Sequence, residues 1–344
     1  MPKHTRRKLR WSLAGIAVLV TVILCIPAIL VKQFDDSPGT GNSVETESPP
    51  EVREKTLLVP VYMSKLGETR KIPLEQYVRG VVAAEMPVEF ELEALKAQAI
   101  AARTYLLWRL KSGETTVTDT IADQAYTSEE AMREKWGLFH YKRNMEKLTK
   151  AVNETQGLIL TYNGEPIQAT YFSTSNGYTE DSENYWGVKV PYLRSVSSPW
   201  DELNSPSFNK ETSLSVQEMK KRLGLETTER APGIKILEKS ASGRVLRLQA
   251  GDQTMSGRQF RELLGLPSTD FTWAERGDNM IFTTAGYGHG VGMSQWGANG
   301  MAQTGAYAED ILKHYYTGAA VESMELAQLQ TKNIFLAPGM PMYK

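Results

Sequence analysis

The chain has 344 residues, of which 41% are hydrophobic and 23% charged, so it holds enough apolar side chains to build a core and does not have the composition of a disordered protein. The formal net charge is -1, but the first ten residues hold five basic side chains and no acid, which leaves the rest of the chain acidic. Nucleic-acid binding requires a basic surface, and this charge distribution argues against it.

A membrane anchor is predicted near the N-terminus. Residues 11–31 contain no charged side chain, and about 20 helical residues span a bilayer core of about 30 Å. Because basic residues precede this run, residues 1–10 are predicted to be a cytoplasmic tail, with the remainder outside the membrane. The alternative is a cleaved signal peptide. The length of the run and the lack of a small-x-small cleavage site after it disfavour that alternative.

Residues 32–55 are rich in Ser, Gly, Pro, Thr and acidic residues, which predicts a flexible linker. The only cysteine, Cys25, lies inside the predicted anchor, so an outer domain has no intramolecular disulfide. Such a domain fits a Gram-positive bacterium better than a eukaryotic secreted protein.

Residues 56–344 are predicted to form one extracytoplasmic α+β domain. A strand is expected at 57–63, a helix from Pro73 to Glu85 that Pro87 ends, and a second helix over 91–113. A capping box from Thr127 to Glu130 predicts the start of a third helix, and Asn163-Gly164 predicts a hairpin turn between two strands within 157–175.

The second half of the chain continues the mixture of helices and hairpins. Short helices are expected after Ser215, within 255–265 and at 293–303 and 307–318, with a hairpin over 233–251 and a strand at 281–285. The lack of a βαβ rhythm favours α+β over a doubly wound sheet. We find neither an internal repeat nor a second linker, which favours a single domain.

Glu85 is the first candidate for chemistry. It lies at a helix end before a proline, preceded by small and apolar residues in VVAAEMP. Apolar surroundings raise the pKa of a carboxyl group, as a general acid near neutral pH requires. An ordinary solvated glutamate in a last helical turn is the alternative, and the local sequence alone favours it.

Two further stretches offer polar groups that could bind a ligand. The alanine-rich helix AQAIAARTYLLWR carries Gln98, Arg103 and Tyr105, and because Gln98 and Arg103 are not on one helical face, at most a subset lines a site. The turn YFSTSNGY offers Ser173, Ser175 and Asn176 near several aromatic residues, a combination that suits sugars. The alternatives are a core helix and an ordinary connecting turn.

The most specific stretch is GYGHGVGMSQWGANGMA, residues 286–302, whose six glycines require unusual dihedral angles or close backbone approach. His289 lies between two of these glycines, and Gln295 opens the helix that follows. The stretch is neither a dinucleotide fingerprint nor a phosphate loop, and the chain has no H-E-x-x-H, CxxC or G-x-S-x-G motif. A tight glycine loop packed under a helix is the alternative.

The segments AAEMP, LKAQAIAARTYLL, YFSTSNGYTE and GHGVGMSQWGANGMA, in this order, resemble the stage II sporulation protein D family over residues 56–320. The resemblance implies a peptidoglycan lytic transglycosylase that cuts peptide-stripped strands between N-acetylmuramic acid and N-acetylglucosamine and leaves 1,6-anhydro ends. It implies that Glu85 is the catalytic acid. It leads us to assign Arg103, Tyr105, Ser173, Ser175, Asn176, His289 and Gln295 to the sugar groove.

The resemblance also implies a place of action and partners. It implies septal cell-wall degradation and engulfment during sporulation, together with a cell-wall amidase (stage II sporulation protein P) and a membrane protein (stage II sporulation protein M). Some clostridial members bind zinc through a histidine and two cysteines. This chain has no cysteine outside residues 11–31, so we predict no metal and no cofactor.

Two functions from different classes remain open. One is the enzyme, for which a single carboxyl suffices because the 6-hydroxyl of the sugar replaces the water and the second carboxylate of ordinary glycosidases. The other is a non-catalytic scaffold that binds glycan and activates a cell-wall amidase, since related sequences are amidase enhancers. A glutamate at position 85 favours the enzyme.

Overall fold

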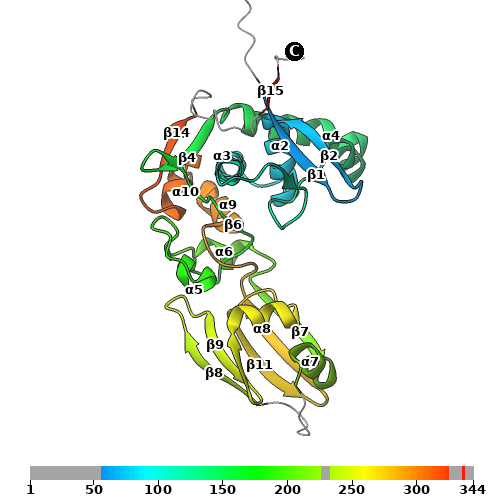
Figure 1. Ribbon diagram of the computed structural model, residues 1–344, viewed down its shortest axis with the longest axis vertical. Helices are drawn as coiled ribbons and strands as arrows, with labels where there is room; N and C mark the ends of the chain where they lie inside the picture. Colours follow the sequence, from blue (N-terminus) through cyan, green and yellow to red (C-terminus); the bar gives the residue numbers. More distant parts are fainter. Residues whose placement is uncertain (1–55, 226–232, 325–334, 338–344) are drawn as a thin grey trace, which may run out of the picture. The chain divides into compact units, whose positions relative to one another are not determined.

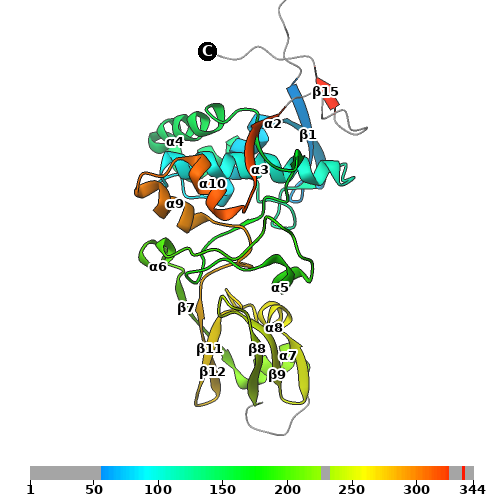
Figure 2. The same cartoon turned by 90° about the vertical axis from the view of Figure 1, so that its left-hand side faces the viewer.

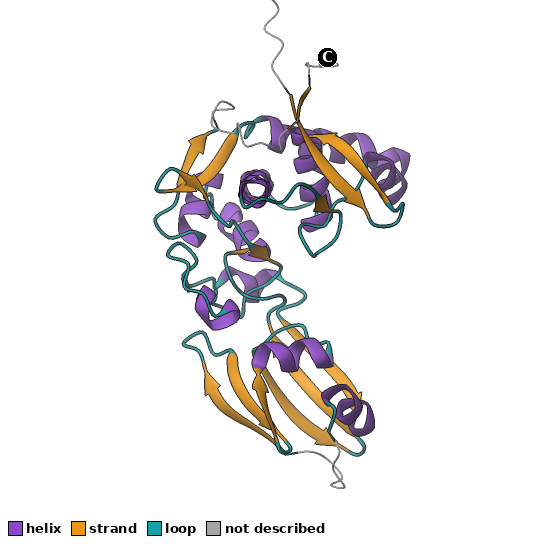
Figure 3. Ribbon diagram, viewed as in Figure 1, coloured by secondary structure: helices purple, strands orange, loops and turns teal. Residues whose placement is uncertain are grey.

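The computed structural model describes residues 56–225, 233–324 and 335–337, all of which belong to one compact unit, Arg53–Lys344. The tail, anchor and linker predicted for residues 1–55 lie outside the described residues. Within the described ranges, no helix is long and apolar enough to cross a membrane. The described part is a mixture of helices and mostly antiparallel strands, which confirms the α+β prediction (Figure 3).

The first hydrophobic core surrounds the long helix α3 (Leu92–Lys111), which is buried on most sides by its neighbours (Figures 1 and 2). Its alanines allow close approach of the helices around it, which are α2 (Leu74–Glu85), α4 (Glu129–Asn153), α9 (Gln295–Gln303) and α10 (Ala308–Tyr315). Pro73 precedes α2, and Met86 turns extended before Pro87, so the helix ends at Glu85 as predicted.

Two small sheets flank these helices. In the first, β1 (Thr56–Met63) pairs with β2 (Glu68–Pro73), β3 (Val117–Thr118) and β15 (Phe335–Ala337). In the second, β4 (Leu158–Tyr162) pairs with β5 (Glu165–Pro166) and β14 (Ala320–Ser323). The predicted Asn163-Gly164 turn is confirmed, because both residues have positive φ, 54° and 76°.

The strand after this turn is shorter than predicted. Only Glu165–Pro166 pairs with β4, whereas β6 (Tyr171–Phe172) pairs in parallel with β13 (Met293–Ser294). The prediction for α4 is also corrected. Its N-cap is Ser128, whose side chain accepts a hydrogen bond from the backbone N–H of Ala131, and not Thr127.

Residues 209–285 build a second hydrophobic core. Here β8 (Ile234–Lys239), β9 (Val245–Ala250) and β10 (Gln253–Ser256) form one sheet, and β7 (Asn209–Ser215), β11 (Phe271–Arg276) and β12 (Asn279–Ala285) form another. Helices α7 (Val216–Leu223) and α8 (Gly257–Leu264) pack on these strands. The helix after Ser215, the helix within 255–265 and the 233–251 hairpin are confirmed, whereas β7, β10 and β11 were not predicted.

The stretch between the two cores is mostly loop. It holds two short helices that the sequence did not predict, α5 (Ser182–Trp186) and α6 (Trp200–Asn204). The glycine-rich loop 286–292 leads from β12 back to β13 and the first core. The path of this loop brings residues 286–302 next to the C-terminal end of α2.

Candidate active site

Glu85 is held by two segments that lie far from it in the sequence. The backbone N–H of Ala125 donates a hydrogen bond to Oε1 at 2.9 Å, and the side-chain amide of Gln295 donates to Oε2 at 3.4 Å. Glu85 is half-buried at the end of α2, so part of the residue is open to solvent. Both hydrogen-bond donors are neutral amides, so no charged side chain holds the carboxyl group in place.

Burial raises the pKa of Glu85 above that of an ordinary glutamate, because the apolar surroundings disfavour the ionised form. The hydrogen bonds from Ala125 and Gln295 act in the opposite direction and limit the rise. The carboxyl therefore stays protonated to a higher pH than a solvated glutamate, as an acid catalyst requires.

A neutral polar network lies beside Glu85. Gln124 donates to the hydroxyl of Tyr77 at 3.3 Å and accepts from the hydroxyl of Tyr171 at 2.8 Å. Burial raises the pKa of both phenols, so they stay neutral. Gln124 also donates to the carbonyl of Ala102 in α3 at 3.3 Å, which ties the loop that carries Ala125 to the central helix. Sequence reasoning missed Gln124 and Ala125.

Helix α9 fixes the turn at residues 86–91 that follows Glu85. The ring of Trp296 packs edge-on against Phe90 at 4.7 Å between centroids, and the side chain of Asn299 accepts from the backbone N–H of Glu91 at 2.8 Å. The same helix begins with Gln295, which is almost fully buried. The motif SQWGAN thus contacts both Glu85 and the chain just beyond it.

A buried carboxylate, Asp201, anchors the start of α9. It accepts hydrogen bonds from the hydroxyls of Ser175 and Ser198 at 2.8 and 2.6 Å, and from the hydroxyl of Ser294, the N-cap of α9. Burial raises the pKa of Asp201, and these hydrogen bonds oppose the rise. Gly297 approaches this cluster so closely that a Cβ there would lie 2.1 Å from the hydroxyl of Tyr315.

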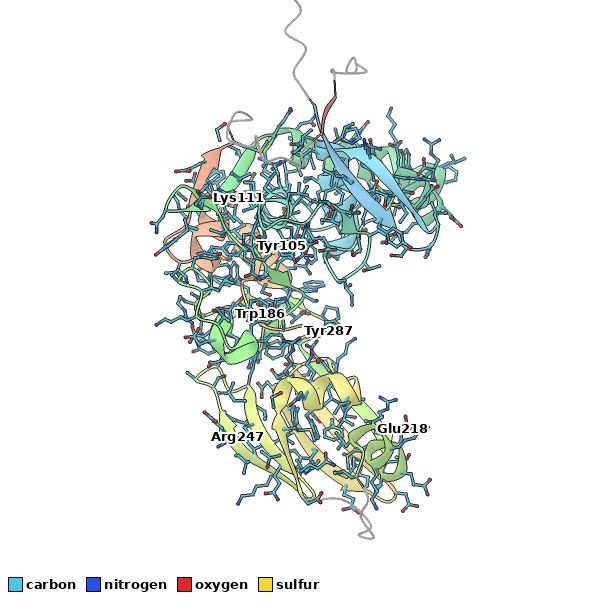
Figure 4. All side chains as sticks on the ribbon, in the orientation of Figure 1. Tyr105, Lys111, Trp186, Glu218, Arg247 and Tyr287 are labelled. Atoms are coloured by element: carbon cyan, nitrogen blue, oxygen red, sulfur yellow. The ribbon has the colours of Figure 1, made fainter. Side chains whose placement is uncertain are left out.

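His289 binds backbone groups with both ring nitrogens. The N–H of Val291 donates to Nδ1 at 3.1 Å, so Nε2 carries the proton and donates to the carbonyl of Tyr171, also at 3.1 Å. Burial lowers the pKa of His289 to about 4, and the charge of Arg261 adds to the shift. The ring is neutral at physiological pH and lies among Phe172, Tyr185 and Trp186, the last labelled in Figure 4.

Arg103 and Tyr105 have different surroundings. The Arg103 side chain is fully buried, forms a two-point ion pair with Glu75 and donates to the carbonyl of Leu158 at 3.0 Å. Tyr105, labelled in Figure 4, is half-buried. Its ring lies 5.6 Å from that of Trp108, and burial raises its pKa. Of the two, only Tyr105 is accessible to a ligand.

The serine-rich turn is used mainly inside the protein. Ser175 is fully buried against Asp201, and the amide nitrogen of Asn176 donates to the carbonyl of Ser242 and the carboxylate of Asp270, both at 2.7 Å. Ser173 remains partly exposed, and its hydroxyl lies 3.1 Å from that of Thr174. The turn therefore joins the two cores, and of the three predicted residues Ser173 and Asn176 are partly exposed whereas Ser175 is buried.

No second carboxylate contacts Glu85 in the described part of the chain. Asp123 is the acid closest to Ala125 in sequence. It is paired with Arg109 at 2.8 Å and accepts from the backbone N–H of Thr118 at 2.9 Å. Glu93 at the start of α3 pairs with Lys96 at 2.7 Å. Over the same described ranges, no three His, Cys, Asp or Glu side chains gather in a way that could hold a metal ion.

The sequence of the chain is similar to those of several known proteins. Residues 62–162 match the family model described as SpoIID: Stage II sporulation protein. The chain is 41% identical over 328 residues to "Stage II sporulation protein D" of Bacillus subtilis (strain 168), which covers 90% of this chain and 95% of that protein. The protein of the same name from Bacillus amyloliquefaciens is 42% identical over 332 residues, which covers 91% of this chain and 95% of that protein.

A more distant relative has a different name. The "Amidase enhancer" of Bacillus subtilis (strain 168) is 32% identical over 299 residues, which covers 72% of this chain and 40% of that protein. The similarity to this longer protein extends well beyond residues 62–162.

Proposed function

The chain belongs to the stage II sporulation protein D family, and on this premise we propose that it is a lytic transglycosylase of peptidoglycan in which Glu85 is the acid and base. Membership implies a role in cell-wall remodelling during sporulation. The substrate proposed is the glycan strand stripped of its stem peptides, cut between N-acetylmuramic acid and N-acetylglucosamine. The observation that carries the proposal is a partly exposed carboxyl with a raised pKa, held by two amide groups.

The proposed reaction uses one carboxyl twice. Glu85, protonated, gives its proton to the glycosidic oxygen as the bond from C1 of the muramoyl residue to that oxygen breaks. The resulting carboxylate takes the proton of the 6-hydroxyl of the same muramoyl residue while O6 bonds to C1. The products are a free N-acetylglucosamine end and a 1,6-anhydro end, no water is consumed, and Glu85 regains its proton.

The neutral network beside Glu85 supports this scheme. Glycosidases that use water or a covalent intermediate need two carboxyl groups at defined separations. Here the groups beside Glu85 are amides and phenols that hydrogen-bond to Glu85 or to one another, and none of them is a second carboxylate. An intramolecular hydroxyl gains over water by proximity, so a second carboxylate is not required.

Glu85→Gln tests the proposal. The substitution keeps the Oε1 acceptor for Ala125, and a rotation of the Gln295 amide restores the second hydrogen bond, so the fold is expected to remain. Loss of proton transfer should reduce strand cleavage by at least about 10²–10⁴-fold. Cleavage is followed on peptide-stripped strands by mass spectrometry, and products of the unaltered protein should carry 1,6-anhydromuramic ends.

Glu89→Gln is the matched control, because Glu89 is exposed and lies just beyond Pro87. It should cleave at the normal rate. Reducing muramic ends in the products would show that the bond is hydrolysed by water. The reaction would then require a second carboxylate beside Glu85. Normal cleavage by Glu85→Gln would remove the catalytic assignment.

The similarity to the amidase enhancer favours a second candidate function, a glycan-binding scaffold that activates a cell-wall amidase. We propose the amidase (stage II sporulation protein P) and the membrane protein (stage II sporulation protein M) as partners at the septal membrane. Amidase activity measured with and without the Glu85→Gln variant separates the two functions, since a scaffold keeps its effect when the carboxyl is lost.

A further inference from the structure

Helix α4 contains a sharp corner that presents apolar side chains to solvent. Gly137 has φ 62° and ψ 172°, which interrupts the helix, and the hydroxyl of Tyr141 donates to the carboxylate of Glu129 across the corner. Arg133 lies over the ring of Tyr141 at 4.8 Å, so the two helical stretches fold back on each other. The corner is therefore fixed by its own side-chain contacts.

Leu138 and Phe139 form the apex of this corner and are exposed by 83% and 96%. Trp136, just before Gly137, packs instead against the first core. Two adjacent large apolar side chains in water are unfavourable, and among the described residues neither of them packs against the two cores. Two side chains also cover far less than the roughly 800 Å² per partner of a stable protein–protein interface.

Basic side chains surround the two apolar residues at the apex. Lys142 and Arg143 follow Leu138 and Phe139 by one helical turn and so lie behind them on the same faces, exposed and without an acidic partner in the described residues. Lys135 and His140 are also exposed near the apex, and the unpaired acids close by, within the same described helix, are Glu134 and Glu146. The net charge of these exposed side chains is therefore positive near the two apolar residues.

We propose that this apex, Leu138 and Phe139 with Lys142 and Arg143, inserts into the surface of a membrane that contains anionic lipid. The apolar pair enters the boundary between headgroups and acyl chains, while the two basic side chains, one turn behind, reach the lipid phosphates. In Figures 1 and 2, α4 lies at the same end of this unit as β1, with which the described chain begins. The anchor predicted at residues 11–31 would tether the rest of the chain to a membrane, and a tethered domain needs only a weak additional contact with the lipid surface.

The test uses the full chain reconstituted into vesicles, in a Cys25→Ser background that removes the only natural thiol. Phe139→Cys carries an environment-sensitive nitrobenzoxadiazole label, and Leu203→Cys, 88% exposed in α6, is the matched control. The vesicles are phosphatidylcholine alone or phosphatidylcholine with one third phosphatidylglycerol. Emission wavelength and quenching by spin-labelled lipid are measured.

The proposal expects a blue-shifted and quenched label at position 139 in phosphatidylglycerol vesicles, and a label at 203 that stays water-like. Adding Lys142→Glu and Arg143→Glu should reverse the shift at 139. If the label at position 139 keeps the emission wavelength that it has in water and is not quenched in the anionic vesicles, the proposal is wrong. The apex would then be a candidate contact surface for a protein partner. Equal shifts at 139 and 203 overturn the proposal as well. Neither readout depends on glycan cleavage.

Discussion

At the scale of single residues, the hydrogen bond from Gln295 adjusts the acidity of Glu85. This bond favours the ionised carboxyl and so lowers its pKa against the larger effect of burial. Gln295→Leu removes the donor, so the pKa of Glu85 should rise further. The basic limb of the pH–rate profile for strand cleavage is then expected at higher pH than in the unaltered protein.

Gln303→Leu provides the comparison for this measurement, because Gln303 is exposed at the other end of α9. Its pH–rate profile should match that of the unaltered protein. A Gln295→Leu profile that also matches would show that the amide does not act on Glu85.

His289 makes folding stability sensitive to acid. Its folded-state pKa of about 4 lies below the unfolded value of 6.5, so between these limits the unfolded chain binds a proton that the native ring does not. Stability is therefore complete above pH 6.5 and falls as the pH is lowered toward 4, by on the order of 2–3 kcal/mol for a ring with some solvent contact. His289→Gln should flatten this slope in urea titrations at pH 4–7, and an unchanged slope would assign it to other groups.

The residues that meet around Glu85 could be predicted from the sequence where a motif contains them, and could not where tertiary pairing brings them together. Glu85 and Gln295 both lie in the quoted motifs, and the structure brings them together. Ala125 and Gln124 lie in a loop with no local pattern, so only the folded chain shows them beside Glu85. The burial of Arg103 depends on Glu75, a partner on another helix that periodicity cannot identify.

At the scale of elements, the glycine loop sets the position of α9 through contacts that exclude a side chain. Gly292 has φ +84°, and a Cβ there would lie 2.0 Å from the carbonyl oxygen of Thr170. Gly292→Ala should therefore separate β13 from β6, displace Gln295, and cost on the order of 3 kcal/mol or more in urea denaturation together with loss of cleavage.

Gly305→Ala measures how much of the destabilisation by Gly292→Ala comes from the positive φ angle alone. Gly305 also has positive φ, +95°, but a Cβ at this position would meet no atom within 4 Å, so the expected loss is only about 1–2 kcal/mol. Equal destabilisation by the two variants would mean that the contact with Thr170 is unimportant.

Element boundaries were predicted best where a local signal is unambiguous. The Asn163-Gly164 turn and the end of α2 before Pro87 follow from backbone dihedral preferences. At α4, Thr127 and Ser128 are both good N-caps, and only packing selects the second. The parallel partner of β6 comes from the far end of the chain, so no local pattern could reveal it.

At the scale of the whole molecule, we expect function without a metal ion. The only cysteine is Cys25, so the part that contains Glu85 has no thiolate for zinc. Purified protein should hold well under one zinc per chain by mass spectrometry, and treatment with a chelator should leave both strand cleavage and the melting temperature unchanged. Stoichiometric zinc lost together with activity would contradict this.

The parallel pairing of β6 with β13 has a consequence for the order in which the chain folds. The hydrogen bond from Ser294 to the carbonyl of Ser173 closes a loop of 121 residues, and Gln295 reaches Glu85 only after that closure. The entropy cost of closure falls when the intervening segment is already compact, and residues 209–285 have a core of their own. A nascent chain that emerges N-terminus first therefore completes the surroundings of Glu85 late, only after residues 286–302 have been synthesised, so an incomplete chain lacks the contact between Gln295 and Glu85.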